Sequence, residues 1–218
     1  MKIISPTLEH DIETVDNADS RLLKDETIKN IQAISFNVAG CKIKAAEIDQ
    51  CKLQKVDFSE ASLEKLTVKD TFIDSGSLVA CDFTDTGWRY VVITDTRCSG
   101  ALFQMSKLSH VVFRGCKLDL VNFRYAKLEN ILFDNCQLND TDFYNCELTN
   151  VVFDGCTIEK IELSAAKLKK VDFSSSELET VQGITSMKDA IVSSLQLIQL
   201  APYMANELGL IVKQDNEG

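Results

Sequence analysis

The side chains best suited to chemistry in this 218-residue chain are its eight cysteines. Thiolates bind zinc or pair as disulfides, but a zinc site needs ligands at a short spacing such as CxxC. No CxxC pair occurs, and only two histidines, His10 and His110, could complete a metal site. Neither histidine has a cysteine or an acid at a spacing that predicts a catalytic dyad. We therefore expect no metal, no cofactor, no catalytic residue and no enzyme activity.

A five-residue repeat determines where these cysteines lie. Every fifth residue from Val38 to Leu178 is apolar, and the residue two positions before each of them is uncharged and mostly small. Cys98 takes the large position, and the other seven take the small one: Cys41, Cys51, Cys81, Cys116, Cys136, Cys146 and Cys156. The functional interpretation is that the stacked cysteines bind metal ions or undergo redox chemistry. We favour the structural one, because a thiol is a small hydrophobic group of the size that this position needs.

A period of five fits neither a continuous helix nor a continuous strand, so the chain must turn at every repeat. The large residue and the small one then point inward from one short extended segment. Two sets of identical residues recur at intervals of twenty: Cys116, Cys136 and Cys156, and Phe113, Phe133, Phe153 and Phe173. Since a solenoid stacks equivalent positions, four such segments make one coil.

The predicted fold is therefore all-β. It is a right-handed quadrilateral parallel β-helix of about seven coils with a C-terminal α-helical cap. The right hand follows from the strong preference of parallel crossover connections.

Two stretches of the repeat identify a resemblance. VNFRYAKL at residues 121–128 and SSEL at residues 175–178 resemble the A(D/N)LXX motif of pentapeptide-repeat proteins. The resemblance covers about two-thirds of the chain and implies the quadrilateral β-helix of that family. It leaves function open, because unrelated functions occur on one solenoid shape.

An open solenoid exposes its core at both ends, so both ends need covers. We expect three parts: an acidic leader and N-terminal cap over residues 1–35, the repeat β-helix over residues 36–180, and a helical cap and dimerisation tail over residues 181–218. In the last part, the capping-box-like run at residues 186–189 predicts the start of one helix. Pro202 permits a second, short helix over residues 203–208.

The apolar residues of the tail have two interpretations. They plug the core, or they form a dimer interface, because they exceed what one face of a cap needs. The candidate interface residues are Leu197, Leu200, Tyr203, Met204, Leu208 and Leu210. MANELGLIV at residues 204–212 resembles the terminal helix and strand of the quinolone-resistance members of the family, which protect DNA gyrase. In those relatives the tail joins two rods end to end, which implies a homodimer here.

Two kinds of surface feature recur every twenty residues. The first is an apolar stripe at positions that should face water: Phe72, Val92, Val112, Leu132 and Val152. The second is a pair of acidic rows, Asp134 with Asp154 and Asp142 with Glu162, that could imitate phosphates. The stripe either reflects the β-propensity of branched residues or marks a contact with a partner. The acidic rows are either a partner surface or ordinary solvated charge.

The charge balance disfavours direct binding of nucleic acid. The chain has 33 acidic and 23 basic residues and a net charge of -10, whereas nucleic-acid binders need a basic surface. Residues 38–180 carry 22 acids and 17 bases, and therefore only half of that charge. The sequence has no 18-residue apolar run and no apolar signal core near its start. We expect a cytoplasmic protein with reduced thiols and no membrane partner.

Two functions remain open from the sequence. The resemblance implies a non-enzymatic, dimeric, protein-binding rod that mimics DNA, binds DNA gyrase or topoisomerase IV and modulates quinolone sensitivity. The unbroken repeat is similar to that of loopless members, and departs from relatives whose loops contact the enzyme. The alternative is a structural or scaffolding module that uses the apolar stripe and has no connection with gyrase.

Overall fold

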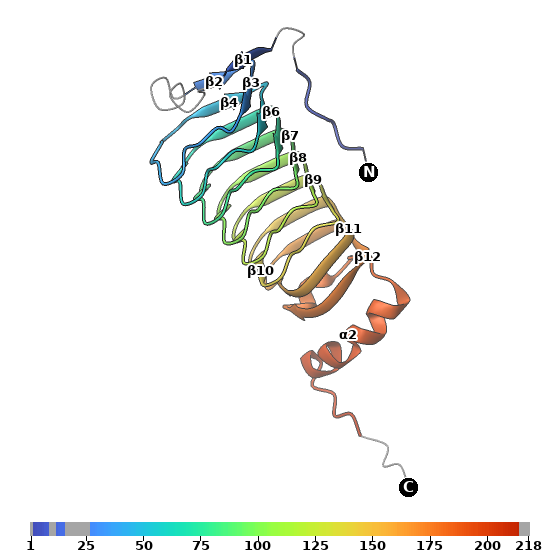
Figure 1. The fold of residues 1–218 in the computed structure, drawn as a ribbon. Helices are drawn as coiled ribbons and strands as arrows, with labels where there is room; N and C mark the ends of the chain where they lie inside the picture. Colours follow the sequence, from blue (N-terminus) through green and yellow to red (C-terminus); the bar gives the residue numbers. More distant parts are fainter. Residues whose placement is uncertain (1, 9–11, 16–26, 214–218) are drawn as a thin grey trace.

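The computed structural model describes residues 2–8, 12–15 and 27–213. His10 and much of the predicted leader lie outside these residues. The described chain winds into a right-handed, four-sided parallel β-helix that ends in a helical segment (Figure 1). The predicted fold class is confirmed.

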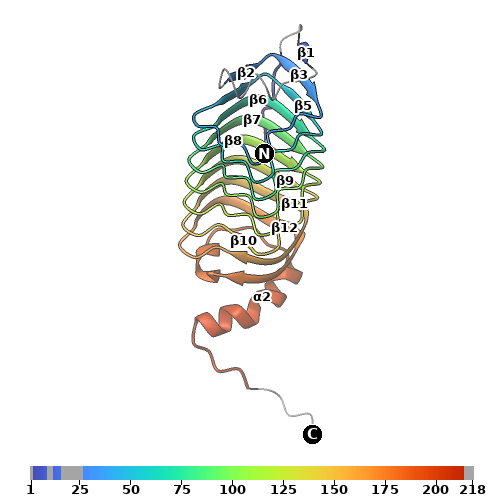
Figure 2. The ribbon, with the colours of Figure 1, turned by 60° about the vertical axis from the view of Figure 1, so that its left-hand side comes forward.

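Strands β1 to β9 lie along two adjacent sides of the coil, β10 lies on another side, and β11 and β12 continue past the first two sides; all belong to one sheet. Their bounds are β1 Glu13–Val15, β2 Thr27–Lys29, β3 Ile31–Ile34, β4 Glu47–Asp49, β5 Lys52–Gln54, β6 Thr67–Asp74, β7 Gly87–Thr94, β8 Lys107–Arg114, β9 Lys127–Asp134, β10 Thr141–Asp142, β11 Glu147–Glu162 and β12 Lys167–Gln182. From β6 to β9 each strand turns one corner and covers both sides. Figure 2 shows the coils stacked along the rod.

Successive coils pair in parallel with an offset of twenty residues. Thr67 pairs with Gly87 and Phe72 with Val92, and single bridges such as Lys42 to Ser62 continue this offset on the other sides. Pairing begins with β1, which pairs with β3, and β2 and β3 pair in turn with β4 and β5, so the described coils number about eight rather than seven. Among the described residues the offset departs from twenty where Glu13 pairs with Ile31, Asp154 with Ser175 and Asp172 with Ile191.

Residues in the left-handed backbone conformation form most of the corners. The residue two positions after the large one has a positive φ in most repeats, such as 45° at Asp70, 56° at Asn130 and 60° at Gly115. Glycine adopts this region freely, and asparagine and aspartate adopt it more readily than other side chains. The corner thus explains why these residue types recur at that position.

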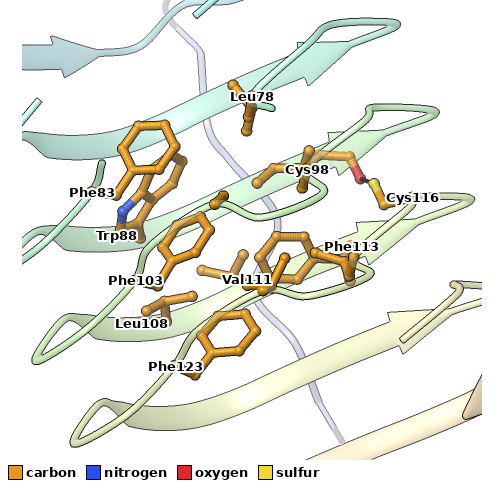
Figure 3. Packing of buried hydrophobic residues seen from close by; sticks show 14 of the residues in the cluster. Leu78, Phe83, Trp88, Cys98, Phe103, Leu108, Val111, Phe113, Cys116 and Phe123 are labelled. Carbon is orange, nitrogen blue, oxygen red and sulfur yellow. Dashed lines mark hydrogen bonds between the residues drawn. The ribbon is translucent and has the colours of Figure 1, made fainter. Parts of the chain in front are cut away.

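Aromatic columns fill the core (Figure 3). Phe83, Phe103 and Phe123 stack with ring centroids 5.0 and 5.2 Å apart. On the opposite side, Phe133 stacks on Phe113 at 5.2 Å, and the two columns meet edge to face. The offset of twenty therefore places like side chains on one another, as the repeat predicts.

The small position supplies hydrogen-bond donors inside the core. Cys136 Sγ lies 3.3 Å from the carbonyl oxygen of Phe113, and Ser176 Oγ lies 2.8 Å from that of Phe153. Each donor thus satisfies the carbonyl of a large residue in the preceding coil. Burial raises the pKa of the Cys146 thiol to about 12, so this thiol stays protonated and can donate.

The helical end differs from its predicted form. A 3-10 turn, η1, spans Ile184–Met187, and a single α-helix, α2, spans Ser194–Glu207 and contains Pro202. The predicted helix start at residues 186–189 and the separate helix at 203–208 are therefore wrong. The capping box lies at Ser193 and Gln196, where each residue's side chain accepts a hydrogen bond from the other's main-chain nitrogen.

Tertiary contacts explain this later start. Ile191 still pairs with Asp172 as part of a further coil. Gln196 Nε2 then donates to the carbonyl oxygens of Phe173 and Ser176, both at 2.7 Å. Gln196, in the first turn of α2, therefore takes the place that Cys156 and Ser176 fill in the preceding coils, and this contact fixes where α2 starts.

Removing one ring from a column should destabilise the whole rod. Phe133→Ala is expected to lower the free energy of unfolding by about 3–5 kcal/mol, because the ring is fully buried between two others. Urea denaturation followed by circular dichroism measures this change. The control is Tyr125→Ala, whose side chain is half exposed. Equal losses for the two variants would contradict the column as a source of stability.

Losing the cap contact should loosen the last coil. Gln196→Ala leaves two main-chain carbonyls without their donor, at a cost of about 1–3 kcal/mol. We expect faster hydrogen exchange in β12 and little change in β7. Gln199→Ala, an exposed position on the same helix, is the matched control. Unchanged exchange in β12 would show that the contact does not close the core.

Candidate functional site

The structure brings the five residues of the apolar stripe together on one side of the rod. Phe72, Val92, Val112, Leu132 and Val152 are direct partners in successive parallel strands, from β6 to β11. Four of them are partly exposed, and Val112 is buried, with 8% of its surface accessible. The stripe is thus a continuous apolar surface along the rod axis.

Residues 2–8, which we call the strap, run along this side of the rod in the direction of its axis. The main-chain nitrogen of Ile4 donates to His110 Nδ1 at 3.2 Å, and that of Thr7 donates to Asp70 Oδ1 at 3.1 Å. In Figure 1 the N-terminal segment runs alongside the upper coils of the rod. Sequence reasoning missed the strap, because these residues lack the repeat and only their apolar and proline content sets them apart from the acidic residues that follow.

A groove lies between the strap and the stripe. Ile3 and Ser5 line it from the strap, and Val112, Leu132 and Val152 line it from the rod together with Arg114. The stripe is therefore partly covered by the chain itself.

The first acidic row lies beside the stripe on the same side. Asp134 and Asp154 are strand partners, two residues beyond Leu132 and Val152. Arg114 stands next in this row, and its Nε donates to Asp134 Oδ2 at 2.7 Å. Asp154 Oδ1 accepts a hydrogen bond from Ser175 Oγ at 2.8 Å. One of the two carboxylates is therefore ion-paired.

The second acidic row lies on another side of the coil. Asp142 pairs with Glu162, and Arg124 Nε donates to Asp142 Oδ2 at 2.6 Å. Hydrogen bonding to Asp142 raises the pKa of Arg124, and the neighbouring pair with Asp140 raises the pKa of Lys160 in the same way. An arginine thus pairs with one carboxylate here too, and the two rows lie on different sides of the rod.

The predicted dimer residues divide into two groups. Leu197, Tyr203, Met204, Leu208 and Leu210 are exposed, the last two by 71% and 61%. Leu200 is buried at 2% and belongs to the chain's own core. The structure adds exposed apolar residues that the prediction left out, namely Leu195, Ile198, Ile211 and Val212.

Neither metal-binding geometry nor a catalytic dyad is seen in the described part of the chain. Across residues 2–8, 12–15 and 27–213, no group of three or more His, Cys, Asp or Glu side chains is arranged to hold a metal ion. The ring of His110 contacts Tyr90, Asn130 and the strap. The helices among these residues are too short or too polar to span a bilayer.

Comparisons with known proteins agree with this architecture. A family model described as a pentapeptide repeat region matches residues 81–163 and 133–187. No curated protein sequence matches the chain.

Several solved structures are similar to the chain. A trypsin-treated form of QnrB1, a plasmid-mediated fluoroquinolone resistance protein, is 16% identical and has a TM-score of 0.48, with 93% of this chain and 100% of that chain covered. HetL, a pentapeptide repeat protein involved in heterocyst differentiation regulation in Nostoc sp. strain PCC 7120, is 16% identical with a TM-score of 0.26, with 77% and 85% covered.

The five-residue repeat, the four-sided coils with an offset of twenty and the family match all describe one architecture. The chain belongs to the pentapeptide-repeat family.

Proposed function

We propose that this protein is a non-enzymatic, protein-binding rod that mimics DNA, binds DNA gyrase or topoisomerase IV and modulates quinolone sensitivity. The observation that carries the proposal is a straight four-sided rod with carboxylates at intervals of one coil. A rod of this kind presents a fixed shape and rows of anions to a basic groove. The proposed setting is the cytoplasm.

The charge pattern indicates that shape contributes more than electrostatic attraction. Residues 38–180 carry 22 acids and 17 bases, spread over about seven coils that rise ~4.8 Å each. Duplex DNA carries one negative charge per ~1.7 Å, a far higher density. Moreover, Arg114 and Arg124 each neutralise one carboxylate of a row. Binding to a basic groove should therefore weaken with salt, but less steeply than the binding of DNA.

A supercoiling assay tests the gyrase proposal. Micromolar protein should inhibit DNA gyrase, or restore its activity in the presence of ciprofloxacin. Asp134→Asn with Asp154→Asn should raise the concentration needed for half the effect several-fold, because that row is lost. Glu60→Gln with Glu64→Gln, two exposed acids elsewhere on the rod, is the control. Neither inhibition nor rescue at micromolar protein would overturn the proposal.

We further propose that the exposed apolar residues of the tail form a homodimer interface. Leu197, Met204, Leu208 and Leu210 lie at the free end of the rod, where a second rod can meet them end to end (Figure 1). Leu200 is outside this interface, because it is already buried within its own chain.

A charge placed in this surface should give monomers. Met204→Asp is the cleaner substitution, since the hydroxyl of Tyr203 also lies 3.3 Å from Thr180 Oγ1 within the chain. Tyr203→Asp should have the same effect on mass. Sedimentation equilibrium measures the mass, and Gln199→Asp on an exposed polar position of α2 is the control. A dimer that survives both tail substitutions would refute the interface.

The apolar stripe favours a second function, that of a scaffolding module unrelated to gyrase. Five apolar side chains in register are more than a solvated sheet surface requires. This function and the first are separated by the supercoiling assay, in which a scaffold has no effect.

A further inference from the structure

We propose that the apolar stripe is a binding groove for an extended peptide, and that the strap is its intramolecular ligand. A partner segment can then occupy the groove only after the strap has left. This autoinhibitory arrangement does not depend on gyrase binding. It rests on the fit between residues 2–8 and the side of the rod that they run along.

The two anchors of the strap match the spacing of the coils. His110 and Asp70 stand two coils apart, which is ~10 Å at the usual separation of neighbouring strands. Ile4 and Thr7, which donate to them, are three residues apart, also ~10 Å in an extended chain. An extended segment that runs along the rod axis therefore meets both acceptors without strain.

Ile3 is the strap residue that the groove covers most clearly. Ile3 and Ser5 both line the groove against Val112 and Leu132, but only Ile3 is partly buried, whereas Ser5 is exposed and Ile4 is 43% exposed. The groove thus selects an extended peptide that carries a branched apolar residue at the position of Ile3.

Pro6 suits the strap to this groove. Proline has no main-chain N–H, and it lies between the two donors, Ile4 and Thr7, so no hydrogen bond of the strap is lost. It also restricts the preceding residue, Ser5, to an extended conformation. The strap is therefore partly ordered before it binds, which lowers the entropy cost of docking.

The rod holds its acceptor in position. The ring of His110 is tilted against that of Tyr90 in the preceding coil, with centroids 5.4 Å apart, and its Nε2 lies 3.3 Å from the amide of Asn130 in the next. Asn130 is itself held by a hydrogen bond from Asn150 Nδ2 to its Oδ1 at 3.1 Å. Neighbours on both sides thus enclose the imidazole whose Nδ1 accepts from the strap.

A labelled peptide tests whether the groove binds the strap in trans. The probe is fluorescent KIISPTL, the sequence of residues 2–8, and the readout is anisotropy. The receptor is the full chain with Ile3→Asp and Thr7→Pro, which remove the apolar contact and one donor of its own strap. We expect this receptor to bind the peptide at least about tenfold more tightly than the parent chain, in which the strap competes.

Matched variants locate the site. Leu132→Asp in the strap-released receptor should abolish binding. Leu102→Asp should not, because Leu102 holds the equivalent position in the repeat on a different side of the rod. A peptide with Asp in place of Ile3 should not bind either. Circular dichroism of each receptor verifies that it is folded.

Three results would overturn the proposal. They are equal affinity of the peptide for the parent and the strap-released chain, no binding to the released chain, and equal losses from Leu132→Asp and Leu102→Asp. His110→Ala gives a second measurement within the parent chain. It removes the acceptor of Ile4, so the Ile4 amide should exchange with solvent faster, and an unchanged rate would show that the strap is not docked there.

Discussion

The structure depends on one constraint, which is that each coil must hydrogen-bond to the next with an offset of twenty residues. The offset recurs on all four sides of the rod, from the pairing of β2 with β4 to that of β11 with β12. Because every residue lies beside its equivalents in the adjacent coils, its neighbours are fixed by its position in the repeat. Phenylalanine columns, corner residues and core donors all follow from this single geometric rule.

The same rule determines what the surface can present. An outward position repeated in several coils becomes a row about one strand spacing apart, whatever its chemistry. The apolar stripe and the Asp134–Asp154 row are two such rows on one side. Yet a row of like charges carries a repulsive cost. Arg114 stands in line with the first row and Arg124 reaches the second from two residues farther along its coil; each pairs with one carboxylate and relieves that cost.

Most of the rod could be predicted because its interactions are periodic. The spacing of Phe113 and Phe133 indicates the length of one coil, and the small size of Cys136 indicates that its side chain points inward. The predictions that were wrong concern parts of the chain whose conformation depends on a single tertiary contact. Helical spacing alone suggested a helix from residue 186, whereas the hydrogen bonds of Gln196 to the last coil delay α2 to Ser194. A further step of twenty from Ser176 leads to Gln196, so the repeat did contain this signal.

The surfaces were harder to predict for the same reason. The residues of the stripe were correctly grouped, but their partial cover by the strap was not foreseen, because residues 2–8 obey no repeat. Leu200 fits the apolar pattern of the tail as well as Leu197 does, yet one is buried and the other exposed. Which of them faces the core depends on how α2 is anchored at Gln196.

The way in which the C-terminal end of the rod is closed bears on its assembly. A stack of coils has no intrinsic end, so its last coil must be closed by residues that no longer form strands. At the C-terminal end Gln196 and Leu200 are the two buried residues of α2, and Ile184, Met187, Ala190 and Val192 also pack against the core. The exposed apolar side chains of the helix are therefore not needed to cover the core. Their exposure to water costs free energy in the isolated chain, and this surplus is the physical reason for the proposed contact with a second molecule at that end.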